Sequence, residues 1–325
     1  MPQFILQIAL VGLGAGACSA LLFASAVSGT ILAPVLFSLA PLPIMIAAVG
    51  WSHWAGLAAA VIAALAAVIV FDPSYFISFL VGVGLPAWWL GYLTLLARPV
   101  GPDGALEWYP PGRLVLWCAV IGPLVILAAL SQLGSSEATI KDALRGVFVQ
   151  LLRAQMQIAD GAPLTIPGVD DPDRLIDVMV IVLPLIAVML TTLTEMLNLW
   201  LATHIVRISG RLKRPWPELS AMRFPPATSI VLAAALAGSF LPDIVGTVAA
   251  LPAASLLVAY AILGFAVLHT ITRNRATRAI VLVTIYTMVA VLIWPILLMT
   301  LLGLVDTALD LRRRVAARGP PAPLA

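Results

Sequence analysis

The sequence predicts an all-α fold, a polytopic helical membrane bundle of eight to nine transmembrane helices with one extracytoplasmic amphipathic helix. Three observations predict it: 62% of the 325 residues are hydrophobic, only 10% are charged, and the apolar residues form long stretches. Soluble domains are about 45–50% apolar and about 25% charged. A soluble enzyme and a disordered chain are therefore both excluded, and stretches of this length favour helices over a β-barrel.

Nine stretches have the roughly 20 apolar residues that a helix needs to cross a bilayer. They lie at approximately residues 4–26, 31–50, 53–71, 74–97, 113–133, 177–205, 227–248, 250–272 and 279–305. We expect residues 1–325 to form a single integral membrane domain, with an extracytoplasmic loop at 134–176 and a polar tail at 312–325. The second stretch contains Pro34, Pro41 and Pro43, so we expect it to be broken or re-entrant.

Small residues recur in the first stretch at Gly12, Gly16 and Ala20. Their four-residue spacing places them on one helical face, where a neighbouring helix can approach closely. The same segment matches a dinucleotide-binding fingerprint only formally, because no strand precedes it. We therefore interpret these residues as helix-packing positions.

The orientation follows from the basic residues of the short loops, because Lys and Arg collect on the cytoplasmic side. Loop 206–226 has five basic residues and one acid, and the loop around 273–278 has three arginines and no acid. Counting crossings from these loops places the N-terminus in the cytoplasm and segment 134–176 outside. A ninth crossing would, however, place the arginines at 312–314 and 318 outside. Either the stretch 279–310 does not cross once, or an earlier stretch is miscounted.

The loop 134–176 contains a predicted amphipathic helix. Ser136 is its expected N-cap, and apolar residues recur after it at helical spacing. These residues are Ile140, Leu144, Val147, Phe148, Leu151 and Leu152. We expect the helix to lie on the membrane surface or over the mouth of the bundle.

Ionisable residues deep in hydrocarbon are costly, so each one is a functional candidate. Glu195 lies in the sixth stretch with Thr191, Thr194 and Asn198 on adjacent turns, a polar stripe that we expect to hydrogen-bond a ligand or carry a proton. The alternative is that Asn198 and the threonines satisfy a neutral Glu195 across a helix interface.

Trp88 and Trp89 form a second candidate ligand-binding feature in the fourth stretch. Beside the expected kink at Pro86, their rings offer stacking faces for a planar ligand. The alternative is an aromatic belt at the level of the lipid headgroups.

The sequence predicts no enzyme. No set of His, Cys, Asp and Glu has the spacing of a metal site, and no Ser/His/Asp order or phosphate-binding loop is present. Cys18 and Cys118 lie in apolar stretches, where a thiol behaves as a small hydrophobe. We expect no catalytic residue, no metal and no cofactor, and a net charge of +3 does not suggest nucleic acid as a partner.

Two stretches near the C-terminus carry a family resemblance. Gly264-Phe-Ala-Val-Leu-His269 closes one apolar span, and the second stretch runs from Gly303 through Asp306 and Asp310 to Arg312. Together with the order of the spans and the long loop before the sixth, they resemble the YybS-like family of predicted membrane proteins, a bacterial domain of unknown function. Where family members often carry an Asn in the preceding span, this chain has residues 253–255, Ala-Ala-Ser.

That family is similar at fold level to the substrate-capture subunits of energy-coupling factor vitamin transporters. The similarity implies a helical bundle in the lipid bilayer of the bacterial cytoplasmic (inner) membrane, which binds a small ligand from outside. It also implies a separate ATPase and transmembrane coupling module as a partner. Within the motif we expect Asp310 to pair with Arg313 and Arg314, and His269 to meet Asp306.

The functional prediction is a substrate-binding or permease-like transport component for a small solute. The alternative is a non-transporting scaffold that organises envelope proteins through its small-residue faces and acidic loop. A solvent-connected cavity lined by Glu195 would favour transport, whereas a tightly packed core with Glu195 fully satisfied would favour the scaffold.

Overall fold

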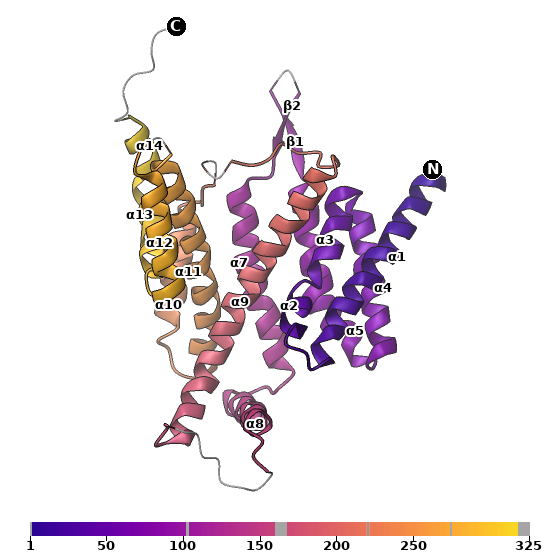
Figure 1. Ribbon diagram of the computed structural model, residues 1–325, viewed down its shortest axis with the longest axis vertical. Coiled ribbons are helices and arrows are strands. Elements are labelled where there is room, and N and C mark those ends of the chain that lie inside the picture. Colours follow the sequence, from indigo (N-terminus) through magenta and orange to yellow (C-terminus); the bar gives the residue numbers. More distant parts are fainter. Residues whose placement is uncertain are drawn as a thin grey trace.

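The computed structural model describes residues 2–101, 104–159, 168–218, 220, 222–273 and 275–317, and within them the chain is a helical membrane bundle (Figure 1). Residues 160–167 of the predicted loop and 318–325 of the predicted tail, including Arg318, lie outside the described residues. Seven helical segments of the described chain are long and apolar enough to cross a membrane. They are Ile5–Val27, Ala33–Gly50, His53–Val70, Ser74–Thr94, Pro111–Ser131, Pro172–Ile208 and Asp243–Ile271.

The helices follow one another from one end of the bundle to the other and back (Figure 1). In chain order the elements are α1 (Pro2–Ala24), η1 (Ser25–Val27), α2 (Ala33–Ser38), α3 (Pro41–Gly50), α4 (His53–Val70), α5 (Ser74–Phe79), the π-helical turn η2 (Leu80–Gly84), α6 (Leu85–Thr94), β1 (Ala97–Val100), β2 (Ala105–Trp108), α7 (Pro111–Ser131), α8 (Glu137–Met156), α9 (Pro172–Ile208), α10 (Ala227–Gly238), α11 (Asp243–Ile271), α12 (Arg278–Leu292), α13 (Ile296–Leu309) and α14 (Leu311–Ala317). We call the end with the β-hairpin, loop 209–226 and α14 the basic end, and the end with α8 the acidic end.

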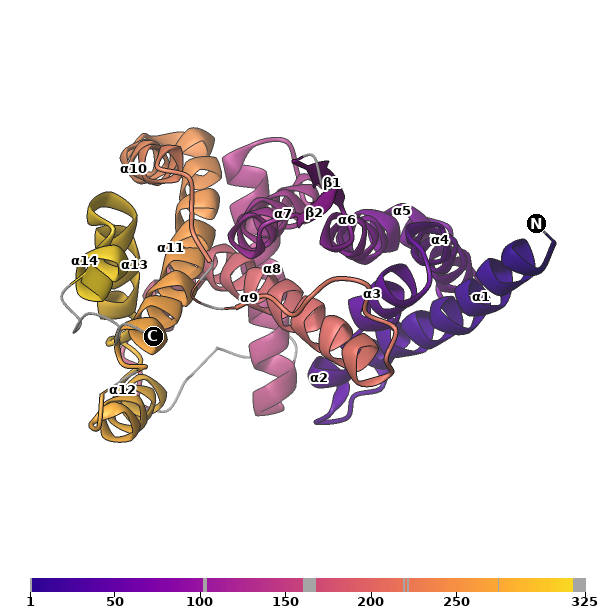
Figure 2. The ribbon, with the colours of Figure 1, turned by 90° about the horizontal axis from the view of Figure 1, so that it is seen from above.

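Helices α7 and α9 lie between two groups of helices (Figure 2). One group consists of α1 to α6, whose core is continued by Cys118 of α7 and Ala202 of α9. The other consists of α10 to α14, whose core is joined by Ala119 of α7. Met196 of α9 packs against both cores. Residues at the middle of α7 and α9 are therefore at the centre of the molecule.

The predicted crossing at 279–305 is a helical hairpin instead. Helix α12 ends at Leu292, the chain reverses at Ile293, which has φ = 59°, and α13 begins after Pro295. At 15 and 14 residues, these helices are only about 22 Å long, shorter than the roughly 30 Å of hydrocarbon in a bilayer. The hairpin returns the chain to the basic end, so both termini of the described chain lie at that end (Figure 1).

This hairpin corrects the expected single ninth crossing and removes the conflict over the C-terminal arginines. Arg312 donates a hydrogen bond to the Ser220 carbonyl, and Arg223 pairs with Asp310. The tail therefore contacts the basic loop 209–226 rather than lying at the opposite end.

The boundary between the seventh and eighth stretches also differs from the expected one. Helix α10 ends at Gly238 after 12 residues, and α11 begins at Asp243 rather than at residue 250. Pro242 is the extended N-cap residue of α11, and Asp243 is an acid in its first turn, where the helix dipole stabilises negative charge. The expected 22-residue span at 227–248 is therefore divided by a turn.

The second apolar segment is broken between α2 and α3, at residues 39–40. Non-helical backbone at membrane depth is stable only if neighbouring groups satisfy its polar atoms. Here the Asn198 side chain donates to the Ser38 carbonyl over 2.7 Å, and the Ser19 hydroxyl donates to the Ala40 carbonyl over 2.6 Å. Side chains of α9 and α1 thus hold the break in place.

Small residues allow close packing of α1 on α4. A Cβ atom added to Gly12 would lie 2.9 Å from the Ala58 Cβ, and one added to Gly16 would lie 2.8 Å from the Ala59 carbonyl oxygen. Ala20, one turn further, is 8% exposed. The face formed by these three residues is the one that α1 presents to the bundle.

The amphipathic helix α8 lies across the acidic end of the bundle (Figure 1). Ser136 caps it in a capping box with Thr139, which confirms the predicted N-cap. Ile140 and Leu144 pack against apolar residues of α7, α9 and α11. Arg145 forms ion pairs with Asp173 and Asp177, at the start of α9. Helix α9 is 37 residues long, about 55 Å, so its first turns extend beyond the bilayer core to meet α8.

Candidate functional site

Three polar residues occupy the buried face of α9 at three-residue intervals: Thr192, Glu195 and Asn198. This spacing places them on one side of a helix. Glu195 is 2% exposed, and no described residue forms a hydrogen bond with its Oε2. A charged carboxylate in such a place is costly. Glu195 is therefore either protonated or able to receive a proton or a cationic group.

Asn198 has a structural partner. Its amide donates to the Ser38 carbonyl at the break between α2 and α3 and to the Thr194 carbonyl of its own helix. Its Oδ1 is buried and, among the described residues, has no hydrogen-bond partner. The side chain thus anchors the broken segment and keeps one acceptor free beside Glu195.

Among the described residues, neither threonine of the predicted stripe, Thr191 or Thr194, forms a hydrogen bond with Glu195. The Thr191 hydroxyl donates to the Ala187 carbonyl of its own helix, and Thr194 contributes only its carbonyl to Asn198. The buried threonine is Thr192, whose hydroxyl lies 2.7 Å from that of Ser255 on α11. Sequence reasoning missed this pair, although Thr192 is three residues from Glu195 and Ser255 is a polar residue in an apolar segment.

Trp88 and Trp89 lie on α6 in an aromatic cluster. The Trp88 ring stacks on Tyr92, and the Trp89 ring meets Trp117 edge-on at a centroid distance of 5.3 Å. Both indole N–H groups are buried without a hydrogen-bond partner among the described residues. None of the described ring contacts or hydrogen bonds connects this cluster to Glu195, although both tryptophans pack against the same core as Met196 and Cys118.

A cavity of about 640 Å³ lies beside Glu195, between α7, α9, α11 and loop 209–226. Its inner end is lined by Cys118 of α7 and by Met196, which follows Glu195 in α9. Its outer end, toward the basic end of the bundle, is lined by Arg214 and Trp216. Glu195 itself does not line the cavity, but Cys118 and Met196 do.

The glycines of the C-terminal motif mark a close crossing of α11 and α13. A Cβ atom on Gly264 would lie 1.8 Å from the Met299 carbonyl oxygen, and one on Gly303 would lie 2.3 Å from that of Tyr260. Neither position accepts a larger residue without moving a backbone. These two motif residues are explained by helix packing.

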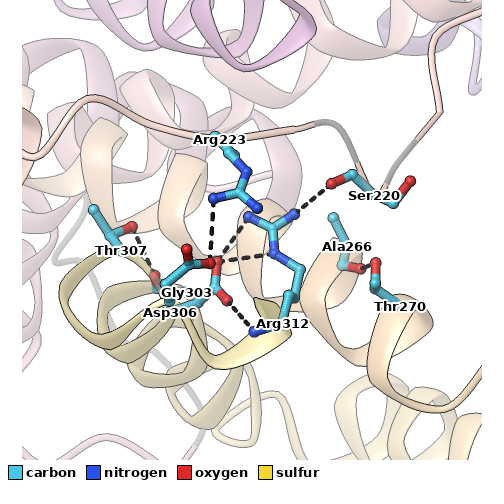
Figure 3. Close-up of polar contacts among 9 residues, drawn as sticks. Ser220, Arg223, Ala266, Thr270, Gly303, Asp306, Thr307 and Arg312 are labelled. Carbon is cyan, nitrogen blue, oxygen red and sulfur yellow. Dashed lines mark hydrogen bonds and ion pairs between the residues drawn. The ribbon is translucent and has the colours of Figure 1, made fainter. Parts of the chain in front are cut away.

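Asp306 and Arg312 form a buried ion pair at the basic end (Figure 3). Their side chains are 3% and 5% exposed, and the guanidinium Nη2 and Nε lie 2.7 and 3.0 Å from Oδ2. The Arg312 backbone N–H donates to Oδ1, and its Nη1 donates to the Ser220 carbonyl. The pair connects the end of α13, the start of α14 and loop 209–226.

The other two charged positions of the motif have partners that differ from those expected. Asp310 pairs with Arg223 of loop 209–226 at 3.2 Å, rather than with Arg313 or Arg314. His269 Nε2 lies 2.9 Å from the Tyr286 hydroxyl on α12, so it does not meet Asp306. The expected pairing of Asp310 with Arg313 and Arg314 is wrong because Asp310, with φ = 47°, ends α13 and directs its side chain toward Arg223 of the loop.

No group of three or more His, Cys, Asp or Glu side chains in the described part of the chain is arranged to hold a metal ion. At the start of α9, Asp171 caps the helix by accepting a hydrogen bond from the Arg174 N–H, and Asp173 pairs with Arg145. These two carboxylates therefore have structural partners.

Comparison with known proteins gives one match. A family model described as "Predicted membrane protein (DUF2232)" matches residues 17–307, and no curated protein or solved structure matches the chain. The matched range includes Gly264, His269, Gly303 and Asp306 but ends before Asp310 and Arg312. It covers most of the 325 residues and agrees with the family resemblance of the C-terminal stretches. The chain therefore belongs to the DUF2232 family of predicted membrane proteins.

Proposed function

We propose that the protein is a substrate-binding or permease-like component of a membrane transport process for a small solute. The observation that carries the proposal is the Glu195 carboxyl, which is buried at the centre of the bundle with Oε2 unpartnered among the described residues. Intramembrane ionisable groups of this kind often mark substrate or proton paths.

The chemistry of the site favours a proton or a cationic group as the species that Glu195 receives. A neutral carboxyl is tolerated in an apolar interior, and a charged one is stabilised when a cation approaches it. The free Oδ1 of Asn198 is a second acceptor on the same face of α9. Two acceptors on adjacent turns suit a ligand that donates hydrogen bonds.

The cavity between α7, α9 and α11 ends next to this site, although Glu195 itself is not one of its lining residues. Its volume of about 640 Å³ falls within the range of about 300–1,000 Å³ that is typical of small-ligand sites. The inner end reaches Cys118 and Met196, the neighbours of Glu195. A side-chain movement at Cys118 or Met196 would open the carboxyl to the cavity.

The proposal includes the location and the partner. The basic end would face the cytoplasm of a bacterium across its inner membrane, because basic loops collect there. The chain has no phosphate-binding loop, so any ATP-driven step would come from a separate ATPase and coupling module, as in the transporters that the family resembles. The chain itself would bind and position the solute without catalysing a reaction.

The test compares the small molecules that co-purify with the wild-type protein, Glu195→Gln and Glu107→Gln, identified by mass spectrometry. Glu107 is a matched control, since it lies in the exposed β-hairpin, where it pairs with Arg98. We expect the wild type and Glu107→Gln to retain a solute that is reduced about tenfold or more in Glu195→Gln, the effect of losing a hydrogen bond to a charged group.

Two outcomes would contradict the proposal. One is an identical set of bound molecules on all three proteins, and the other is no bound molecule on the wild type. Either outcome would favour the alternative function, a scaffold for envelope proteins, which needs no solute at Glu195. Proteins that co-purify would then identify what it organises.

A further inference from the structure

Arg214, in the loop after α9, is a buried cation that forms no ion pair with an acidic side chain of the described residues. Arg214 is 8% exposed, and its Nη1 donates a hydrogen bond to the Thr94 carbonyl oxygen at 3.1 Å. Its Nε is buried without a hydrogen-bond partner, and no carboxylate of the described residues forms an ion pair with it. Burial lowers the pKa of Arg214 from its ordinary value. A buried charge of this kind is stabilised when an anion joins it.

Arg214 lines the cavity of about 640 Å³, whose walls are otherwise mostly apolar. The apolar lining comes from α7, α9 and loop 209–226 and includes Leu114, Val115, Leu193, Leu197, Trp200 and Met222. A site with one cation at its end and a long apolar body matches a ligand with an anionic head and an apolar chain.

The wall formed by α9 reaches the outer surface of the bundle. Leu193, Leu197 and Trp200 line the cavity and are also 38%, 52% and 51% exposed. All three belong to a helix that is long and apolar enough to cross a membrane, so we expect their exposed faces to contact lipid. A ligand can therefore enter sideways from the bilayer.

The outer end of the cavity has a second cation beside it, Arg207. Trp216 lines this end, with the Arg207 guanidinium 4.8 Å above the ring and His204 against its edge. Glu218 also lines this end, but its carboxylate accepts a hydrogen bond from Ser220 and lies 3.9 Å from Arg273. Within the part of the chain that the structure describes, Glu218 thus pairs with Arg273 rather than with Arg214.

We propose that this cavity binds an anionic lipid of the adjacent leaflet, with its phosphate or carboxylate head at Arg214 and an acyl chain along α7 and α9. Basic pockets between transmembrane helices are known to hold acidic headgroups. The inference does not depend on the proposed function, because Arg214 lines the cavity, whereas Glu195, which carries the proposed solute site, does not.

The test measures lipid binding to the full-length protein in detergent by native mass spectrometry, with dioleoylphosphatidylglycerol as the probe. Dioleoylphosphatidylcholine has the same chains without net charge, and inorganic phosphate has the anion without the chains. The variants are Arg214→Gln, Lys213→Gln as a matched control with an exposed side chain, and Leu197→Trp, which narrows the lateral opening at an exposed position.

We expect one phosphatidylglycerol per chain on the wild type and on Lys213→Gln, and binding about tenfold or more weaker to Arg214→Gln. Leu197→Trp should also weaken binding, and it tests the site independently if Arg214→Gln does not fold. Phosphatidylcholine should bind less well, and millimolar phosphate should not displace the lipid.

Equal binding to Arg214→Gln and the wild type would overturn the inference, as would equal binding of the two lipids. Displacement by phosphate would show a site for a free anion and would also overturn it. These failures are separable from failure of the proposed function, which depends on the effect of Glu195→Gln on co-purifying solutes.

Discussion

Replacing Asp306 with Ala would leave the Arg312 guanidinium buried without its carboxylate. Both side chains are almost fully buried, and Asp306 accepts three hydrogen bonds or ionic contacts from Arg312. Removing one member of a buried ion pair costs about 3–5 kcal/mol, because the other charge is left uncompensated. We expect Asp306→Ala and Arg312→Met each to lower the free energy of unfolding by an amount of this order.

The double variant gives the sharper test. Removing both charges together leaves neither one unpaired, so its cost should be smaller than the sum of the two single costs by about 1–3 kcal/mol. The control is Arg223→Gln, which removes the more exposed pair with Asp310 at the same end of the bundle. An exposed pair contributes at most about 1 kcal/mol.

The assay is unfolding of the purified proteins in mixed detergent and SDS micelles, followed by tryptophan fluorescence. The reasoning would be refuted if Arg223→Gln destabilised the protein as much as Asp306→Ala. Strict additivity of the two single costs in the double variant would refute it as well, since the two side chains would then act independently.

Gly264→Ala should lower the melting temperature clearly, because its new methyl group meets a carbonyl oxygen of α13, whereas Gly14→Ala, with nothing within 4 Å, should leave it unchanged. Thermal unfolding monitored by fluorescence checks both, and equal melting temperatures would contradict the crossing of α11 and α13. Cysteines introduced at Arg275 and Arg314 should react with a membrane-impermeant thiol reagent from the same side, because both residues lie at the basic end. Labelling from opposite sides would contradict the α12–α13 hairpin.

Hydropathy was sufficient to predict the membrane-crossing helices that are long and uniformly apolar. A window of about 20 apolar residues leaves the backbone of such a segment no alternative to a helix in lipid. The same windows missed the turns at 239–242 and 293–295, where Phe240, Leu241, Ile293 and Trp294 keep the stretch apolar. A turn made of apolar residues does not lower the mean hydropathy of the window, so hydropathy does not detect it. Its stability depends on the helices that pack around it.

The candidate site was predicted in part. Glu195 is recognisable in the sequence, because a carboxyl inside an apolar membrane-crossing stretch is energetically costly and is therefore a functional candidate. Ser255 and Arg214 were not, since they come from another helix and from a loop that composition describes only as basic. Asn198 was assigned to a ligand, whereas the structure shows that it also holds the Ser38 carbonyl of a broken helix.

The low fraction of charge and the long apolar stretches alone determined that this chain is a helical membrane protein, and the basic loops gave its expected orientation. Tertiary structure alone decided how the last third of the chain folds back, which residues surround Glu195, and that Arg214 ends a cavity. The physical reason is the distance along the sequence over which each effect acts. Burial in lipid acts on each segment separately, whereas a turn, a buried charge and a cavity are each stabilised by groups that are distant in the sequence.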